Sequence, residues 1–203
     1  MIDRERFSRM LEESARLMLE EADALSEIDS KFGDADHGLT MAKIAGAISA
    51  AVDGAEGGIQ SMLDDAATAV MALNGGSAVP LWNTWLDGMQ EEAPEGDEID
   101  VAGIKAIFAR AFTELDDMSG AKVGDKTMMD ALIPASQAIA AYPGSDENEL
   151  FTAAAQAAVQ GAEATRQFVS KFGRAKSYGT QTIGTPDAGA ASMAYFFQGL
   201  AQM

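Results

Sequence analysis

The spacing of apolar residues constrains the fold of this chain more than any other feature. Apolar positions recur three or four residues apart in eight segments, at about residues 3–27, 39–52, 59–73, 80–89, 101–115, 127–141, 146–172 and 188–202. The chain is rich in Ala, Met, Leu and Glu, which favour helices, and convincing strand patterns are absent. Because the connections are mostly short, the pattern predicts an all-α fold, an antiparallel bundle or barrel of eight helices.

Composition narrows the class of protein. The 203 residues, 47% of them hydrophobic, are enough for one core, so we expect a single domain over residues 1–203. The net charge of −18 makes nucleic acid and anionic membrane surfaces poor partners. The absence of cysteine excludes disulfides and thiolate metal sites. The charged N-terminus resembles neither a signal peptide nor a membrane span, and we expect a cytoplasmic protein.

Four polar loops are expected to share one end of the bundle. If the helices alternate in direction, the loops after the first, third, fifth and seventh helices lie together. These loops cover residues 29–38, 74–79, 119–126 and 173–187, and they are the richest in Gly, Asp, Lys and Arg. The sequence therefore predicts that the chemistry lies at one rim.

The first of these loops holds three closely spaced aspartates. Asp29, Asp34 and Asp36 repel one another unless a cation lies between them, and hard oxygen donors suit Mg²⁺ or Ca²⁺. Gly33 and Gly38 allow sharp bends, and the helix that follows offers free N–H groups to an anion. The pattern predicts a seat for a metal–phosphate ligand, and the alternative is an acidic surface turn.

The second and third loops carry candidate ligands, each with a structural alternative. The run Asn-Gly-Gly-Ser at 74–77 precedes a helix and would present N–H groups to a phosphate, or it would simply end a helix. Lys126 is a candidate for binding a polyphosphate and Met128 for contacting a nucleobase. Alternatively, Asp125 or Thr127 serves only as a helix cap.

The fourth loop and the single histidine add further candidates. Arg174 would offer a fork to phosphate oxygens, although the preceding Gly173 is also a common helix stop. Asp187 is either a cap or a ligand. His37 lies beside the aspartates and would orient an oxygen, although a lone histidine is usually structural. No P-loop, dinucleotide fingerprint or nucleophile elbow is present.

Together these loops resemble those of the nucleotide-binding L subunit of dihydroxyacetone kinase. The resemblance is carried by Gly-Asp-Ala-Asp-His-Gly at 33–38 with Asp29 before it, by Gly-Asp-Lys-Thr-Met at 124–128, and by Gly-Arg-Ala at 173–175 followed by 183–184 and 187–189. It spans nearly the whole chain in the family's order and spacing. It implies an eight-helix antiparallel barrel with the nucleotide site at one rim, in agreement with the helix count.

The resemblance also implies roles for individual residues. Asp29, Asp34 and Asp36 match three aspartates that hold two Mg²⁺ ions on the nucleotide phosphates, and with Arg174 they are the expected catalytic residues. The expected nucleotide-binding residues are His37, Gly38, Leu39, Thr40, Ser77, Ala78, Gly120, Lys126, Thr127, Met128, Arg174, Asp187, Ala188 and Gly189. Phosphoryl transfer needs charge neutralisation and positioning more than covalent help, and Lys126 and Arg174 are the candidate cations.

The resemblance implies that the kinase activity is divided between subunits. An L subunit binds Mg·ADP or Mg·ATP and delivers the γ-phosphoryl group to dihydroxyacetone, or a related small ketose, on a separate K subunit. In one branch of the family ATP exchanges freely, and in the other a phosphohistidine carrier of the phosphotransferase system recharges bound ADP. The sequence leaves open the donor, the ketose and whether the chain forms a homodimer.

Two departures from the family pattern keep alternatives open. The family's Gly-Gly-Ala-Ser-Gly-Pro reads Gly-Gly-Ser-Ala-Val-Pro at 75–80, and its Asp-Pro-Gly reads Asp-Ala-Gly at 187–189. One alternative is a non-catalytic, nucleotide-binding regulatory paralogue of the same fold. The other is a structural helical protein that binds cations loosely.

Overall fold

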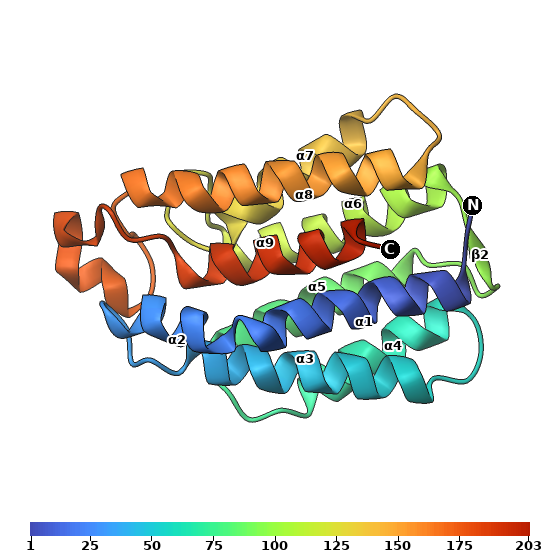
Figure 1. The fold of residues 1–203 in the computed structure, drawn as a ribbon, viewed down its shortest axis with the longest axis horizontal. Coiled ribbons are helices and arrows are strands. Elements are labelled where there is room, and N and C mark those ends of the chain that lie inside the picture. Colours follow the sequence, from blue (N-terminus) through green and yellow to red (C-terminus); the bar gives the residue numbers. More distant parts are fainter.

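A computed structural model describes all 203 residues, and it is almost entirely helical (Figure 1). The α-helices are α1 (Arg4–Glu20), α2 (Ala22–Ser30), α3 (His37–Gly54), α4 (Ile59–Met71), α5 (Ala78–Glu91), α6 (Val101–Ser119), α7 (Met129–Ala141), α8 (Glu147–Ala164) and α9 (Ala188–Ala201). Two 3₁₀ helices, η1 (Thr165–Gln167) and η2 (Arg174–Thr182), lie between α8 and α9. The strands β1 (Ile2–Asp3) and β2 (Glu98–Ile99) form one short antiparallel pair with Ile2 opposite Ile99.

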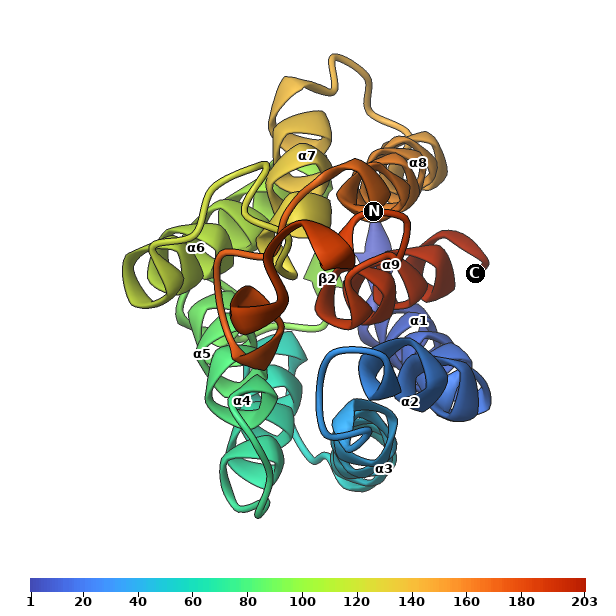
Figure 2. The same cartoon turned by 90° about the vertical axis from the view of Figure 1, so that its left-hand side faces the viewer.

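The helices stand side by side in a closed ring. Seen along the barrel, α3 to α9 follow one another around the circumference, and α1, continued by α2, closes the gap between α9 and α3 (Figure 2). Each helix from α3 to α9 packs on its sequence neighbours, and α1 packs on both α9 and α3. The predicted antiparallel all-α barrel is confirmed.

Aromatic side chains fill the middle of the barrel. The rings of Trp82 and Trp85 on α5 contact each other and the rings of Phe108, Phe196 and Phe197 from α6 and α9. All five are buried and belong to one hydrophobic cluster. The middle of the barrel is therefore packed with apolar side chains.

The first predicted helix, residues 3–27, is broken in the structure. Asp3 caps α1 by accepting a hydrogen bond from the Arg6 N–H, and α1 ends at Glu20. Glu21 leaves helical geometry at ψ 6°, and α2 then continues to Ser30. Asp29 consequently lies on the last turn of a helix, and the predicted loop boundary was wrong there.

The seventh predicted helix, residues 146–172, is also shorter in the structure than predicted. Asp146 caps its start by accepting from the Asn148 and Glu149 N–H groups. It ends at Ala164, and Phe168 is extended. The Thr165 carbonyl closes a 3₁₀ turn by accepting from the Phe168 N–H, and it also accepts a hydrogen bond from Lys126. A tertiary contact thus accompanies the end of the helix.

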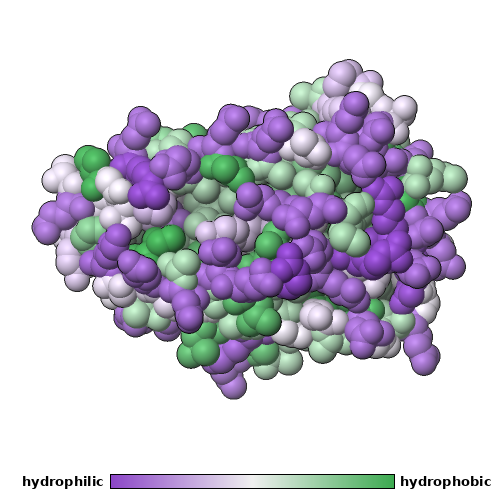
Figure 3. Space-filling view, in the orientation of Figure 1, coloured by the Kyte–Doolittle hydropathy of each residue, from purple (hydrophilic) through white to green (hydrophobic).

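None of the helices combines the length and the apolar character that a membrane crossing requires. The face in Figure 3 is mostly hydrophilic, with scattered hydrophobic side chains.

Candidate functional site

A cavity of about 630 Å³ opens at one end of the barrel, the left-hand end in Figure 1. Its lining comes from all four loops expected to share a rim, between residues 28–40, 76–82, 118–128 and 170–189. The prediction that these loops meet is therefore confirmed. The volume suits a ligand of nucleotide or cofactor size.

Four helices begin at this cavity, namely α3, α5, α7 and α9. The N-termini of α7 and α9 already have side-chain acceptors: the Met129 N–H donates to Thr127 Oγ1, and the Ala190 N–H donates to Asp187 Oδ2. The N-cap residues of α3 and α5, Asp36 and Ser77, make no side-chain cap hydrogen bond. Two helix ends therefore offer free N–H groups and positive dipole ends, which is the arrangement that binds anions.

The predicted aspartate cluster is assembled beside the start of α3. Asp29, Asp34 and Asp36 each bring one carboxylate oxygen within 4.8 Å of the others. Asp29 Oδ2 is buried without any hydrogen-bond partner. A Cβ on Gly33 would lie 2.0 Å from Asp29 Oδ1, so only glycine lets the chain pass this close to the carboxylate. A buried, unpartnered oxygen in a group of hard donors fits Mg²⁺.

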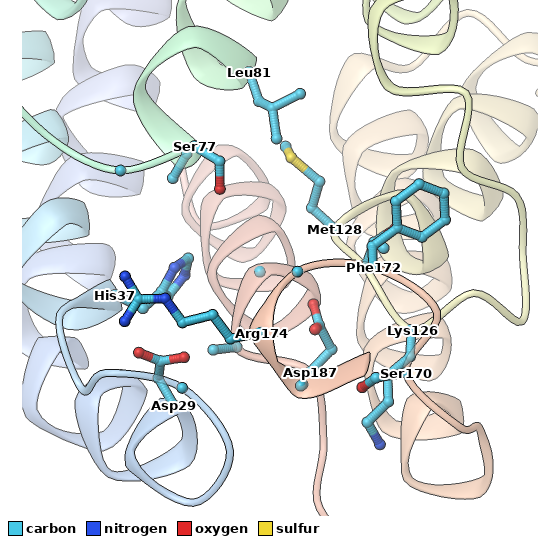
Figure 4. A pocket seen from close by; sticks show the side chains of 18 of the residues that line it. Asp29, His37, Ser77, Leu81, Lys126, Met128, Ser170, Phe172, Arg174 and Asp187 are labelled. Carbon is cyan, nitrogen blue, oxygen red and sulfur yellow. The ribbon is translucent and has the colours of Figure 1, made fainter. Parts of the chain in front are cut away.

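A guanidinium group reaches the cluster from the opposite side. Arg174, at the start of η2, forms an ion pair with Asp34, and Figure 4 shows its side chain extended toward Asp29 and His37. Burial, followed by the charges of Asp34 and Asp29, raises the pKa of Asp36, and Arg174 opposes this shift. Arg174 is thus the only protein cation that contacts the cluster.

His37 is anchored toward α9 rather than free. Its Nε2 lies 3.2 Å from Ser192 Oγ, and that hydroxyl donates to the Gly189 carbonyl, so the ring N–H is the donor in the first contact. Burial lowers the pKa of His37, while Asp29 opposes the shift. The ring is therefore a neutral, fixed part of the wall.

The other side of the cavity is apolar. Leu81, Met128 and Phe172 gather there, opposite the polar group formed by Asp29, His37 and Arg174 (Figure 4). The cavity therefore has a charged half at the starts of α3 and α5 and an apolar half between α5 and α7. Such a division suits a ligand with a polyanionic end and a flat, weakly polar end.

The segment between α8 and α9, residues 165–187, crosses this rim, and we call it the strap. It carries Phe172 and Arg174 along the cavity, and Tyr178 packs on Phe32 with ring centroids 5.2 Å apart. Asp187 ends the strap, and burial raises its pKa to about 7. The nearby Asp130 adds to that shift, whereas the Ala190 N–H and Lys126 oppose it.

Most of the predicted site residues line the cavity, and three do not. Those that line it are Asp29, Asp34, Asp36, His37, Thr40, Ser77, Ala78, Lys126, Thr127, Met128, Arg174, Asp187, Ala188 and Gly189. Leu39 is 59% exposed on the outside of α3, Gly38 packs against Ala22 and Ser26, and Gly120 ends α6 with φ 64°.

The expected role of Lys126 as a phosphate cation does not fit the structure. Its ammonium group donates to three backbone carbonyls behind the cavity wall and is not free to meet an anion. Only Arg174 remains of the two predicted cations.

In the loop at residues 75–80, which departs from the family pattern, the side chain of Val79 is packed against the backbone. Val79 is buried, and a Cβ on Gly75 would lie 2.6 Å from its Cγ2, so the valine side chain supports the loop from below. The residue that replaces a family glycine thus packs against Gly75, one of the two glycines that remain.

Several lining residues were not predicted. Ile28, Phe32, Met118, Ser119, Ala121, Ser170, Phe172, Thr185 and Pro186 contribute to the walls, and the buried Trp82 reaches the cavity too. The sequence spacing of these residues does not indicate a binding site. Only their nearness in sequence to the aspartate, lysine and arginine motifs would have pointed to them.

Comparisons with known proteins agree with this geometry. The family model of the DAK2 domain matches residues 31–202. The chain is 34% identical to a D-erythrulose kinase of Mycolicibacterium smegmatis, over 92% of this chain and 33% of that protein. It is 28% identical to the ADP-binding subunit DhaL of the PEP-dependent dihydroxyacetone kinase of Escherichia coli, over 89% of this chain and 88% of that subunit.

A solved structure shares the fold. The dihydroxyacetone kinase from C. freundii, in complex with AMP-PNP and Mg²⁺, superposes with a TM-score of 0.71 and 24% identity over 96% of this chain and 33% of that one. The chain spans about a third of the length of the erythrulose kinases that it matches. The chain belongs to the DAK2 domain family, of which it is a DhaL-like member.

Proposed function

We propose that this chain is the nucleotide-binding part of a small-ketose kinase, with residues 1–203 acting as one nucleotide-binding domain. The observation that supports this most is the divided cavity, in which the aspartate cluster and two uncapped helix N-termini face an apolar half. A polyphosphate suits the first half and a nucleobase the second. Relatives are described as ADP-binding DhaL subunits and as erythrulose or dihydroxyacetone kinases, which supports ADP or ATP as the ligand.

Each half of the cavity then has a definite task. Asp29, Asp34 and Asp36 would hold Mg²⁺, which we place at two ions by the resemblance and which would offset phosphate charge and polarise the γ-phosphoryl group. The free N–H groups of α3 and α5 would bind phosphate oxygens, and Arg174 would stabilise the charge that develops during transfer.

Neither His37 nor the aspartate cluster is placed as a general base for an acceptor alcohol. His37 is tied to Ser192, and the aspartates face one another. The relatives that are DhaL subunits support an acceptor, dihydroxyacetone or a related ketose, that is held on a separate K subunit docking at this rim. The PEP-dependent relatives support a phosphohistidine carrier as the donor.

A reconstituted transfer assay tests this function. The chain is mixed with a dihydroxyacetone-binding K subunit and either Mg·ATP or a phosphocarrier system, and ketose phosphate is measured. We expect transfer by the wild type, a loss of about tenfold or more for Asp34→Asn, and no change for Asp64→Asn, an exposed α4 carboxylate. Tight Mg·ADP binding without transfer from either donor would contradict the kinase role and favour the regulatory alternative.

A further inference from the structure

Lys126 is the most heavily bonded side chain near the cavity, and the proposed function leaves it without a role. Its Nζ donates to the carbonyl oxygens of Thr165 at 2.7 Å, Thr182 at 2.9 Å and Thr185 at 2.5 Å. These bonds use all three donors of the ammonium group. The residue is 5% exposed, and Figure 4 shows its side chain directed away from the cavity.

The three carbonyls belong to the two ends of the strap. Thr165 lies where α8 ends, whereas Thr182 and Thr185 precede α9. The residues between them include Phe172 and Arg174, which line the cavity. One ammonium group therefore fastens both ends of the segment that carries the arginine.

Both the backbone conformation and the burial of Lys126 are unfavourable. Its φ of 61° is in the left-handed region, which is unfavourable for a residue that carries a Cβ. Burial lowers the pKa of Lys126, with Asp187 opposing the shift, and no carboxylate is hydrogen-bonded to the ammonium. The buried Asp130 fixes the surrounding loop by accepting from the Gly124 and Thr127 N–H groups at 2.6 and 2.7 Å. Strain of this kind persists only where neighbouring structure enforces it.

Other hydrogen bonds also join the ends of the strap, but no other side chain makes three of them. The strap's exposed apolar side chains include Phe172, Tyr178 and Ile183, so it buries little of its own apolar surface. The Gly184 N–H donates to the Arg166 carbonyl, Arg166 Nη1 to the Gly184 carbonyl and the Asp187 N–H to Thr165 Oγ1. Lys171 bonds Asp125 through both its N–H and its ammonium group. A segment with few buried contacts opens easily unless polar bonds fix it.

We propose that Lys126 is a positioning residue whose ammonium group latches the strap and so holds Arg174 against the aspartate cluster. The effect of Lys126 on nucleotide binding rests on the proposed function, whereas its hold on the strap does not. The two parts are therefore tested separately.

Amide hydrogen exchange tests the latch without any ligand. Lys126→Met keeps the length of the side chain and removes its donors. We expect exchange at Ser170, Lys171 and Gly184 to quicken by about tenfold or more, while the protected amides of α1 and α9 are unchanged. Unchanged exchange in the strap would overturn the proposal.

Lys105→Met is the matched control. Lys105 also donates to backbone carbonyls, those of Ala140 and Tyr142, but these lie where α7 ends, away from the cavity. This variant should leave strap exchange as it is. If Lys126→Met does not fold, Lys126→Gln, which keeps an N–H donor on a shorter chain, takes its place. Global unfolding of both variants would overturn the proposal, because it would make Lys126 a general stabiliser.

Coupling to Arg174 tests the second part. In the wild-type background, Lys126→Met should weaken Mg·ADP binding by about tenfold. In a background that already carries Arg174→Ala and Phe172→Ala, the same change should cost less than about twofold. Equal losses in both backgrounds would overturn the positioning role. Failure of the wild type to bind Mg·ADP would instead refute the proposed function, and the exchange result would still decide whether Lys126 latches the strap.

Discussion

Arg174 contacts the same carboxylate that a divalent cation would need. The ion pair joins it to Asp34, and its side chain is 70% exposed, so the pair stabilises the fold little. In this structure the guanidinium is the counter-charge of the aspartate cluster. Sequence spacing pointed to the aspartates and to the arginine separately, but not to their contact, because 140 positions of chain separate them and only the closed barrel brings them together.

This contact predicts opposite effects of one substitution on two ligands. Arg174→Met should strengthen binding of Mn²⁺ alone about two- to fivefold, because it removes a competing positive charge. The same change should weaken Mg·ADP binding about tenfold, because a charge-assisted bond to phosphate is lost. Electron paramagnetic resonance of free Mn²⁺ and calorimetry with Mg·ADP measure the two effects. Lys176→Met, an exposed neighbour on η2, is the control.

Weaker binding of Mn²⁺ alone by Arg174→Met would contradict this account, since the arginine would then be supporting the metal ligands and not competing with the ion.

The raised pKa of Asp187 predicts that the free energy of unfolding depends on pH. Its pKa is raised to about 7 by burial, so between about pH 4 and pH 7 the folded state holds a proton that the unfolded state has released. Its contribution to the free energy of unfolding is therefore complete below about pH 4 and falls as the pH rises through 7. Asp187→Asn keeps the acceptor for the Ala190 N–H and removes the titration.

Urea unfolding at pH 5 and pH 8 measures this effect. We expect Asp187→Asn to gain stability relative to the wild type on going from pH 5 to pH 8. A difference between the two proteins that is the same at both pH values would contradict the assignment.

At the scale of elements, the helices and their order were predictable, and their ends were less so. The helical spacing of apolar residues identified each helical segment of the barrel wall, because each helix buries one face against its neighbours. The break at Glu21 and the early end of α8 at Ala164 were not visible in that pattern. At the end of α8, a contact with a distant residue, the Lys126 bond to Thr165, accompanies the change.

Close helix contacts predict opposite outcomes for two glycine substitutions. A Cβ on Gly199 of α9 would lie 2.3 Å from the Ser14 Cα on α1, so Gly199→Ala should destabilise the fold by about 1–3 kcal/mol through overpacking. A Cβ on Gly46 of α3 would meet nothing within 4 Å. Gly46→Ala should therefore stabilise by about 1 kcal/mol through helix propensity. Chemical denaturation measures both, and a stabilising Gly199→Ala would show that α1 and α9 are not this close.

At the scale of the whole molecule, the barrel places four helix N-termini at one rim of a protein with net charge −18. The sequence predicted that rim because polar, glycine-containing loops alternate with plainer ones. It did not predict the direction of Lys126, because the direction of one side chain depends on which carbonyls the strap leaves unpaired. A local cluster of positive helix ends beside a cation site offsets the general repulsion of an anionic ligand.

Calorimetry of Mg·ADP binding tests the central claim most directly, that the aspartate cluster at this rim binds a nucleotide through a divalent ion. The account predicts binding by the wild type and by the Asp64→Asn control, with Asp34→Asn and Asp36→Asn weaker by about tenfold or more while their helical content is unchanged. Equal affinity of all four proteins would contradict it.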